Sequence, residues 1–143
     1  MPRESIAMDR QEVLDFLRGQ RRLVLGTLDP DGAPWADAAP CVLRGDVLFF
    51  WIPRDSRSFA NIQRDGRACC ALDQYPSYYE IKGATLHGRA VEVRDAIALE
   101  QARAAFELAG GSRDGDLPGD GAVFCMGLDD VVSFDFAKIK TRY

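Results

Sequence analysis

The segment Arg54–Ser58 contains five polar side chains suited to binding a ligand: two arginines, two serines and an aspartate. It follows the apolar run Val47–Ile52 and precedes a short amphipathic stretch that contains Phe59 and Ile62. This order predicts a strand, a turn and a short helix at about Ser56–Arg64. A helix N-terminus has unpaired N–H groups and the positive end of the helix dipole, and serine and arginine add donors that suit a phosphate. We therefore expect this turn to anchor a cofactor that carries a phosphate.

Antiparallel strands joined by short turns are expected to position this segment. Strands are predicted at Arg22–Leu28, Ala33–Leu43 and Val47–Ile52, with tight turns between them that contain Gly32 and Gly45. Such an order is a meander. Proline cannot donate a backbone hydrogen bond, so Pro34 and Pro40 favour an edge or a bulge in the second strand. An open strand of this kind leaves backbone groups free for a ligand.

The remaining patterns predict a mainly β domain with flanking helices. Strands that bend at glycines are typical of barrels, where they turn a corner. The expected elements are a helix that begins at Asp9 with a capping box to Glu12, a strand at Arg67–Asp73, a long strand at Tyr79–Val93 bent at Gly83 and Gly88, a helix at Ala96–Leu108 capped by Asp95, a loop at Gly110–Gly121, and a closing hairpin of Ala122–Leu128 and Val131–Phe136.

Composition narrows the class of protein. The chain of 143 residues suits one domain over residues 1–143, and its net charge of −4 gives no basic field for nucleic acid or a membrane surface. No apolar run reaches the ~20 residues of a membrane span, and the first residues contain no apolar signal core, so we expect a cytoplasmic protein. Four cysteines without a C-x-x-C pair, and the single histidine His87, predict no metal site. No catalytic triad or pair of carboxylates is apparent, and catalytic residues stay unassigned.

The order of these elements, together with the segments LFFWIPRDSRSFANIQRDGRACCAL and KGATLHGRAVEV, resembles the pyridoxamine 5′-phosphate oxidase-like family over nearly the whole chain. The resemblance implies a mainly β fold, a six-stranded antiparallel Greek-key split barrel with two or three flanking helices. It also implies a homodimer with flavin mononucleotide (FMN) at the subunit interface. Some branches of that family use the deazaflavin F420, and others bind haem.

The resemblance also implies which residues contact the cofactor. Ser56 and Arg57 match the pair that grips the phosphate, and Ser58 stands where a lysine is usual. Lys82 or Arg54 is expected to supply the missing charge. The flavin ring is expected to lie against backbone N–H and C=O groups of two strands, at Ala39, Pro40, Cys41 and Val42 of the second and at Phe50, Trp51 and Ile52 of the third.

These expectations combine into an FMN-binding oxidoreductase that acts on an unidentified small molecule. The alternatives are a non-catalytic carrier or sensor of flavin, F420 or haem, with His87 as the haem ligand, an F420-dependent reductase, and a barrel that has lost its ligand. The ending KIKTRY does not contain the Arg/His signature of a true pyridoxamine phosphate oxidase, so that substrate is not expected. Tyr75, Tyr78 and Tyr79 are expected to wall a substrate pocket or to pack at the dimer interface.

Overall fold

The computed structural model describes residues 5–77, 80–114 and 120–140. These residues form eight strands and four helices. In chain order they are α1 (Arg10–Arg18), β1 (Arg22–Leu28), β2 (Pro34–Arg44), β3 (Val47–Pro53), α2 (Arg57–Arg64), β4 (Arg67–Gln74), β5 (Lys82–Arg89), β6 (Val91–Glu92), α3 (Ala96–Asp114), β7 (Gly121–Met126), β8 (Val131–Asp135) and α4 (Ala137–Lys140).

All strand pairs are antiparallel, and the strand order is β6-β7-β3-β2-β1-β4-β5-β8. The meander β1-β2-β3 is followed by α2, after which β4 returns to lie beside β1. Three hairpin-connected strands with a fourth beside the first are a Greek key. The mainly β, antiparallel Greek-key fold with flanking helices is therefore confirmed. The described residues contain eight strand segments where six were expected, partly because one long strand is divided.

The strands curl into two sheets because β2 changes partner along its length. Residues 34–40 of β2 pair with β1, whereas residues 41–44 pair with β3. Sheet A therefore comprises β1, the first half of β2, β4, β5 and β8, and sheet B comprises the second half of β2, β3, β6 and β7. Pro40 lies at the change of partner, so each half of β2 is the edge of one sheet, which confirms the edge position that its prolines favoured.

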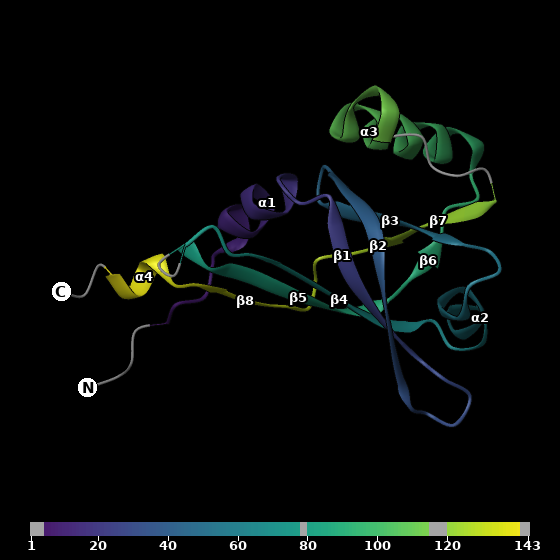
Figure 1. Ribbon diagram of the computed structural model, residues 1–143, viewed down its shortest axis with the longest axis horizontal. Coiled ribbons are helices and arrows are strands. Elements are labelled where there is room, and N and C mark those ends of the chain that lie inside the picture. Colours follow the sequence, from purple (N-terminus) through teal and green to yellow (C-terminus); the bar gives the residue numbers. More distant parts are fainter. Residues whose placement is uncertain (1–4, 78–79, 115–119, 141–143) are drawn as a thin grey trace.

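The main core fills the space between the two sheets. Side chains from both sheets meet there, and the Phe50 and Phe124 rings stack with their centroids 5.6 Å apart. Helix α1 packs onto this core through Val13, Phe16 and Leu17 (Figure 1). Its start follows the expected capping box, since Asp9 accepts from the Glu12 amide and Glu12 accepts from the Asp9 amide.

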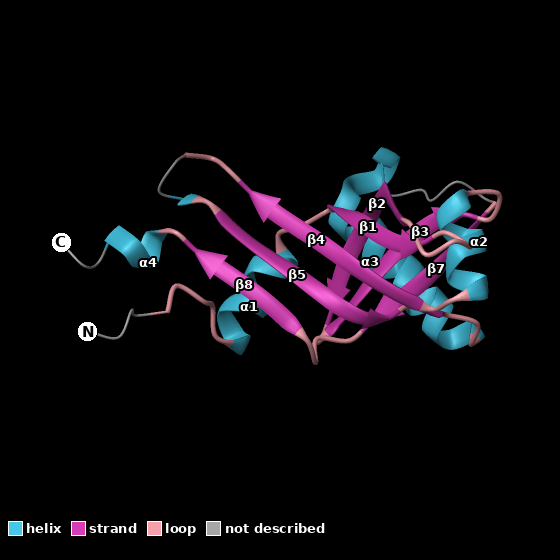
Figure 2. Ribbon diagram, turned by 90° about the horizontal axis from the view of Figure 1, so that it is seen from below, coloured by secondary structure: helices cyan, strands magenta, loops and turns pink. Residues whose placement is uncertain are grey.

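The outer faces of the two sheets differ in what covers them. Helix α3 covers sheet B with a second apolar cluster of Val42, Trp51, Ala102, Phe106 and Val123. On the opposite side, Figure 2 shows β4, β5 and β8 side by side in front of the helices, with no described helix over them. Val24 and Val132 are 48% and 64% exposed on this uncovered face.

Three of the sequence expectations need correction. The strands expected as a closing hairpin exist but do not pair with each other, because β7 pairs with β3 and β6 in sheet B while β8 pairs with β5 in sheet A. The expected long strand begins at Lys82, and it divides after Arg89 because its last residues pair with β7.

The third correction concerns the segment Gly110–Gly121, which was expected to be a loop. Helix α3 continues through it to Asp114, and β7 begins at Gly121, while residues 115–119 lie outside the described residues. Among the residues that the structure describes, no helix is both long and apolar enough to span a membrane.

Candidate functional site

The N-terminus of α2 forms as its sequence predicts. Ser56 has extended backbone angles and caps the helix, with its Oγ accepting from the Phe59 amide at 3.1 Å. The same Oγ donates to the Pro53 carbonyl at 2.7 Å, which ties the helix to the end of β3. The Ser56 hydroxyl is therefore part of the turn itself, and of the first helical turn the Arg57 and Ser58 amides remain as potential anion donors.

Arg57 is held on two sides. Its Nε and Nη2 donate to the two carboxylate oxygens of Asp29, at 2.9 and 2.5 Å. Its guanidinium carbon lies 4.0 Å from the centre of the Trp35 ring, a cation–π stack. Hydrogen bonds from Arg57 and then Asn61 hold the pKa of the Asp29 carboxyl below its ordinary value, and the pKa of Arg57 is raised by the same carboxylate. The Arg57 side chain is still 54% exposed, so its remaining edge can reach a ligand.

Ser58 is the residue that stands in place of the usual lysine, and it is fully buried. Its Oγ donates to Asp37 Oδ2 at 2.5 Å. The same carboxylate oxygen accepts from Trp35 Nε1 at 2.9 Å. The Ser58 hydroxyl is thus used to join α2 to β2, and in this arrangement it offers its proton to a carboxylate and not to a ligand.

Asn61 completes the attachment of α2 to the barrel. Its buried amide nitrogen donates to Thr27 Oγ1 at 3.1 Å and to Asp29 Oδ1 at 3.0 Å. Arg64, one turn later, donates to the Asn61 side-chain oxygen and to the Leu28 carbonyl. Together with the Ser58 contact, these bonds fix α2 across the place where β1 and β2 separate from β3.

The place where β2 and β3 separate is called the fork here. The two stretches assigned to the flavin ring lie on either side of it. After the pair Cys41–Phe50, β2 turns into sheet A, and residues 51–53 of β3 continue in sheet B beside β7. Residues 34–39 of β2 and 51–53 of β3 consequently have a strand partner on one side only. The structure brings these backbone edges and the first turn of α2 together.

The side chains of these stretches point away from the fork or are buried. Ala39, Cys41, Phe50 and Ile52 belong to the main core, and Val42 and Trp51 belong to the cluster beneath α3, while Pro40 is half-buried. Contact with a ring would therefore use the backbone, as the resemblance implies. Trp51 Nε1 is buried, and no described residue accepts its proton.

Within one chain, Lys82 lies far from the first turn of α2. It is the first residue of β5, and Arg89 at the other end of that strand lies near α2, where the Ala90 amide donates to Gly66. Seven residues of strand separate the two ends by about 23 Å. The Lys82 ammonium lies 3.9 Å from Asp135, beside a hollow that Glu12, Asp15 and Gln74 also line.

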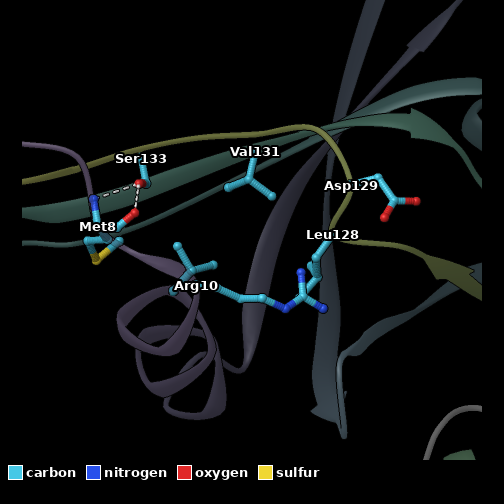
Figure 3. Close-up of a pocket in the computed structure, with 7 residues that line it drawn as sticks. Met8, Arg10, Leu128, Asp129, Val131 and Ser133 are labelled. Carbon is cyan, nitrogen blue, oxygen red and sulfur yellow. Dashed lines mark hydrogen bonds between the residues drawn. The ribbon is translucent and has the colours of Figure 1, made fainter.

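Other candidate residues lie elsewhere. His87 is exposed on the outer face of sheet A, in register with Cys69, and Tyr75 is exposed beyond the end of β4, whereas Tyr78 and Tyr79 lie outside the described residues. A hollow of about 190 Å³ is lined by residues of α1 and β8 and of the turn before β8. Among its lining residues, Arg10 extends toward Leu128 (Figure 3). None of the residues assigned to the cofactor lines that hollow.

Four residues of the site were missed by reasoning from sequence: Asp29, Trp35, Asp37 and Asn61. Asp29 was interpreted only as a turn residue, although its carboxylate organises the network. Asp37 and Trp35 point to the same side of β2 as buried Ala39, so a carboxylate at an inward position was the available signal. Asn61 shares its helix face with Ser58 and Ile62, and polar residues on a buried face indicate a network.

The comparisons with known proteins agree with this fold. The family model described as pyridoxamine 5′-phosphate oxidase matches residues 9–131. No curated protein matches the sequence. A conserved hypothetical protein from Mycobacterium tuberculosis superposes with a TM-score of 0.83 at 20% identity, over 100% of this chain and 94% of that one.

Two further similar structures belong to proteins whose descriptions name a ligand. A FAD-binding protein from Mesorhizobium loti has a TM-score of 0.72 at 17% identity, over 89% of this chain and 94% of that one. The haem storage protein HutZ from Vibrio cholerae has a TM-score of 0.68 at 20% identity, over 94% and 99%. At these identities the structures show a shared fold. The family match over most of the chain shows that this protein belongs to the pyridoxamine 5′-phosphate oxidase-like family.

Proposed function

We propose that this protein is a flavin-dependent oxidoreductase that holds a phosphate of the flavin at the first turn of α2, with FMN as the first flavin to test. The observation that carries the proposal is the arrangement of Arg57. Asp29 and Trp35 fix its guanidinium at a helix N-terminus, yet more than half of its side chain stays exposed. A fixed guanidinium beside unpaired helix N–H groups is suited to an oxyanion.

The residues present fit a flavin in two respects. The first turn of α2 supplies N–H groups and one guanidinium edge for a phosphate, and the unpaired backbone edges at residues 34–39 and 51–53 lie in the same fork for a ring. When bound, a flavin supplies the hydride or electron chemistry. The chain would then bind, orient and shield it, with Arg57 as the phosphate ligand and Asp29 as the residue that positions Arg57.

The experiment is a titration of the purified protein with FMN, followed by flavin absorbance and fluorescence. Replacing Arg57 with alanine removes a charge-assisted donor worth about 1.5–3 kcal/mol, so the dissociation constant should rise roughly 10- to 100-fold. Arg18→Ala is the matched control, because it removes an exposed arginine from α1 whose side chain pairs with Asp15. Absence of any flavin binding by the parent protein would refute the proposal.

We also propose that the protein is a homodimer and that the outer face of sheet A is the surface it buries. This face carries exposed Val24 and Val132, and small residues such as Ala36, Ala38 and Ala71 allow close approach. It also contains an apolar hollow of about 230 Å³ lined in part by Gly26, Leu28 and Cys69. Exposed apolar patches of this kind mark interaction sites.

Light scattering coupled to size exclusion tests the dimer. Val132→Asp should give a monomer, because it places a charge on this apolar surface, at a residue that is 64% exposed on β8. Val91→Asp should remain a dimer, because Val91 is exposed to a similar extent, 57%, on β6 of the other sheet. A monomeric parent protein, or equal behaviour of the two variants, would contradict the assignment of this surface.

A non-catalytic carrier is the second candidate, and one observation favours it. The side chains of Ser56, Ser58 and Asp37 at the turn are all engaged in hydrogen bonds within the chain, which leaves them no free role as acid or base. Steady turnover of a reduced nicotinamide with an electron acceptor would exclude a pure carrier. A haem absorption band that His87→Ala abolishes would identify the cargo as haem.

A further inference from the structure

The donors of the proposed phosphate site are largely used inside the protein. Ser56 Oγ donates to a backbone carbonyl, Ser58 Oγ donates to Asp37, and two nitrogens of Arg57 donate to Asp29. An anion at this turn would therefore meet the remaining edge of Arg57 and the N–H groups of the first helical turn. Among the described residues at this turn, Arg57 supplies the formal positive charge that an anion would contact.

Carboxylates surround that guanidinium. Asp29 contacts it, and Asp31 and Asp37 lie close enough to act on it, so that all three raise the pKa of Arg57. The nearby cations have other partners, since Arg64 is bound to Leu28 and Asn61, and Arg54 pairs with Glu92.

The turn also contains the exposed Asp55, and it carries Ser58 in place of a lysine. The net positive charge near this turn is therefore too small to neutralise the two negative charges of a terminal phosphate.

We propose that the first turn of α2 selects a substituted phosphate, with one charge on the phosphorus, over a doubly charged terminal phosphate, and that Asp37 sets this selectivity. The inference rests on the proposed flavin function and specifies the chemical class of the cofactor. A second charge on the phosphate gains little from Arg57, which Asp29 already neutralises, and it is repelled by Asp37. The half-buried Asp37 carboxylate is held in place, because Ser58 and Trp35 both donate to it.

The test compares three flavins that share one ring. Riboflavin has no phosphate, FMN has a terminal phosphate, and FAD has a pyrophosphate in which each phosphorus carries one charge. At about pH 7.5 FAD should bind more tightly than FMN. The second pKa of a phosphate monoester is about 6, so FMN becomes singly charged as the pH falls to about 5.5.

Over that range FMN affinity should rise about tenfold, while FAD affinity changes less than about twofold. The FAD titration is the control for pH effects that do not involve the terminal phosphate, including any at His87 on the outer face of sheet A. Asp29 remains ionised throughout, since its pKa is lowered.

Asp37→Asn keeps an acceptor and a side chain of the same shape but removes the charge. It should raise FMN affinity at about pH 7.5 by roughly tenfold and abolish most of its pH dependence. Asp46→Asn, an exposed aspartate in the turn between β2 and β3, is the matched control and should change neither. Each titration is expressed as the ratio of its dissociation constant to that of riboflavin. For FMN this ratio isolates the phosphate, and for FAD it reports the pyrophosphate together with the adenosine, so the pH dependence and the effect of Asp37→Asn carry the comparison.

Two results would overturn the selectivity, namely FMN binding that is tighter than FAD at about pH 7.5, or flavin binding that Asp37→Asn leaves unchanged. Either result leaves the flavin function standing. Failure of riboflavin, FMN and FAD alike to bind would overturn both the selectivity and the proposed function, so the two failures are distinguishable.

Discussion

Replacing Asn61 with alanine tests whether the network beneath α2 holds this helix in place. Asn61 is 2% exposed, and its amide donates to Thr27 at 3.1 Å and to the Asp29 carboxylate at 3.0 Å. A neutral hydrogen bond contributes about 1 kcal/mol, and one to a charged group about 1.5–3 kcal/mol. Loss of both should therefore lower the free energy of unfolding by about 2–4 kcal/mol.

Urea unfolding followed by tryptophan fluorescence measures this loss. Gln63→Ala provides the matched control, because Gln63 is an exposed residue of the same helix and should change the free energy by less than about 0.5 kcal/mol. If Asn61→Ala were no more destabilising than Gln63→Ala, the network would not be what fixes α2. The geometry derived for Arg57 would then lack its support.

Three further predictions address packing, acidity and thiol reactivity. Gly121→Ala should cost about 1–3 kcal/mol in the same urea assay, since a Cβ there would lie about 2 Å from the Trp51 indole. Arg67 lowers the pKa of Asp65 to about 2, so the stability that this pair contributes is complete above the unfolded pKa of about 3.9 and is lost as the pH falls toward 2. Asp65→Asn should reduce this acid-dependent loss in thermal unfolding scans. An unchanged pH profile would contradict this prediction. Burial raises the pKa of the Cys41 thiol to about 12, so iodoacetamide at about pH 8 should modify it only in unfolded protein, as peptide mass spectrometry would show.

Local patterns predicted the elements well, because each was determined by residues close in sequence. The capping box at Asp9, the turn glycines Gly32 and Gly45 with their positive φ, and the cap at Ser56 all form as expected. Their energetics depend on neighbours within one or two turns. The family resemblance supplied the Greek-key order, which no local pattern contains.

Pairing between distant strands could not be obtained in the same way. Two apolar stretches with a short turn at Asp129 and Asp130 favour a hairpin, yet here the turn carries the chain from sheet B to sheet A. The pattern predicts a bend at Gly83, whereas its place in the strand is explained by the ring of its cross-strand partner Phe134, which lies where a Cβ would be. Both features depend on which strands pair, and the paired strands are distant in sequence.

The candidate site was predicted in position but not in detail. Ser56 and Arg57 lie at the first turn of α2 as expected, whereas Lys82 lies at the far end of its strand and Ser58 is buried against Asp37. The acidic partners of the turn come from the β1–β2 hairpin, more than twenty residues earlier. Spacing within the motif carries no information about them.

Native mass spectrometry of the purified protein shows whether a flavin is bound and whether Arg57 holds it. We expect a bound flavin at one per subunit, retained in Arg18→Ala and depleted in Arg57→Ala under the same conditions. The depletion should follow from loss of the guanidinium that Asp29 and Trp35 hold at the helix N-terminus. Full flavin occupancy in Arg57→Ala, or a haem in place of a flavin, would contradict the account.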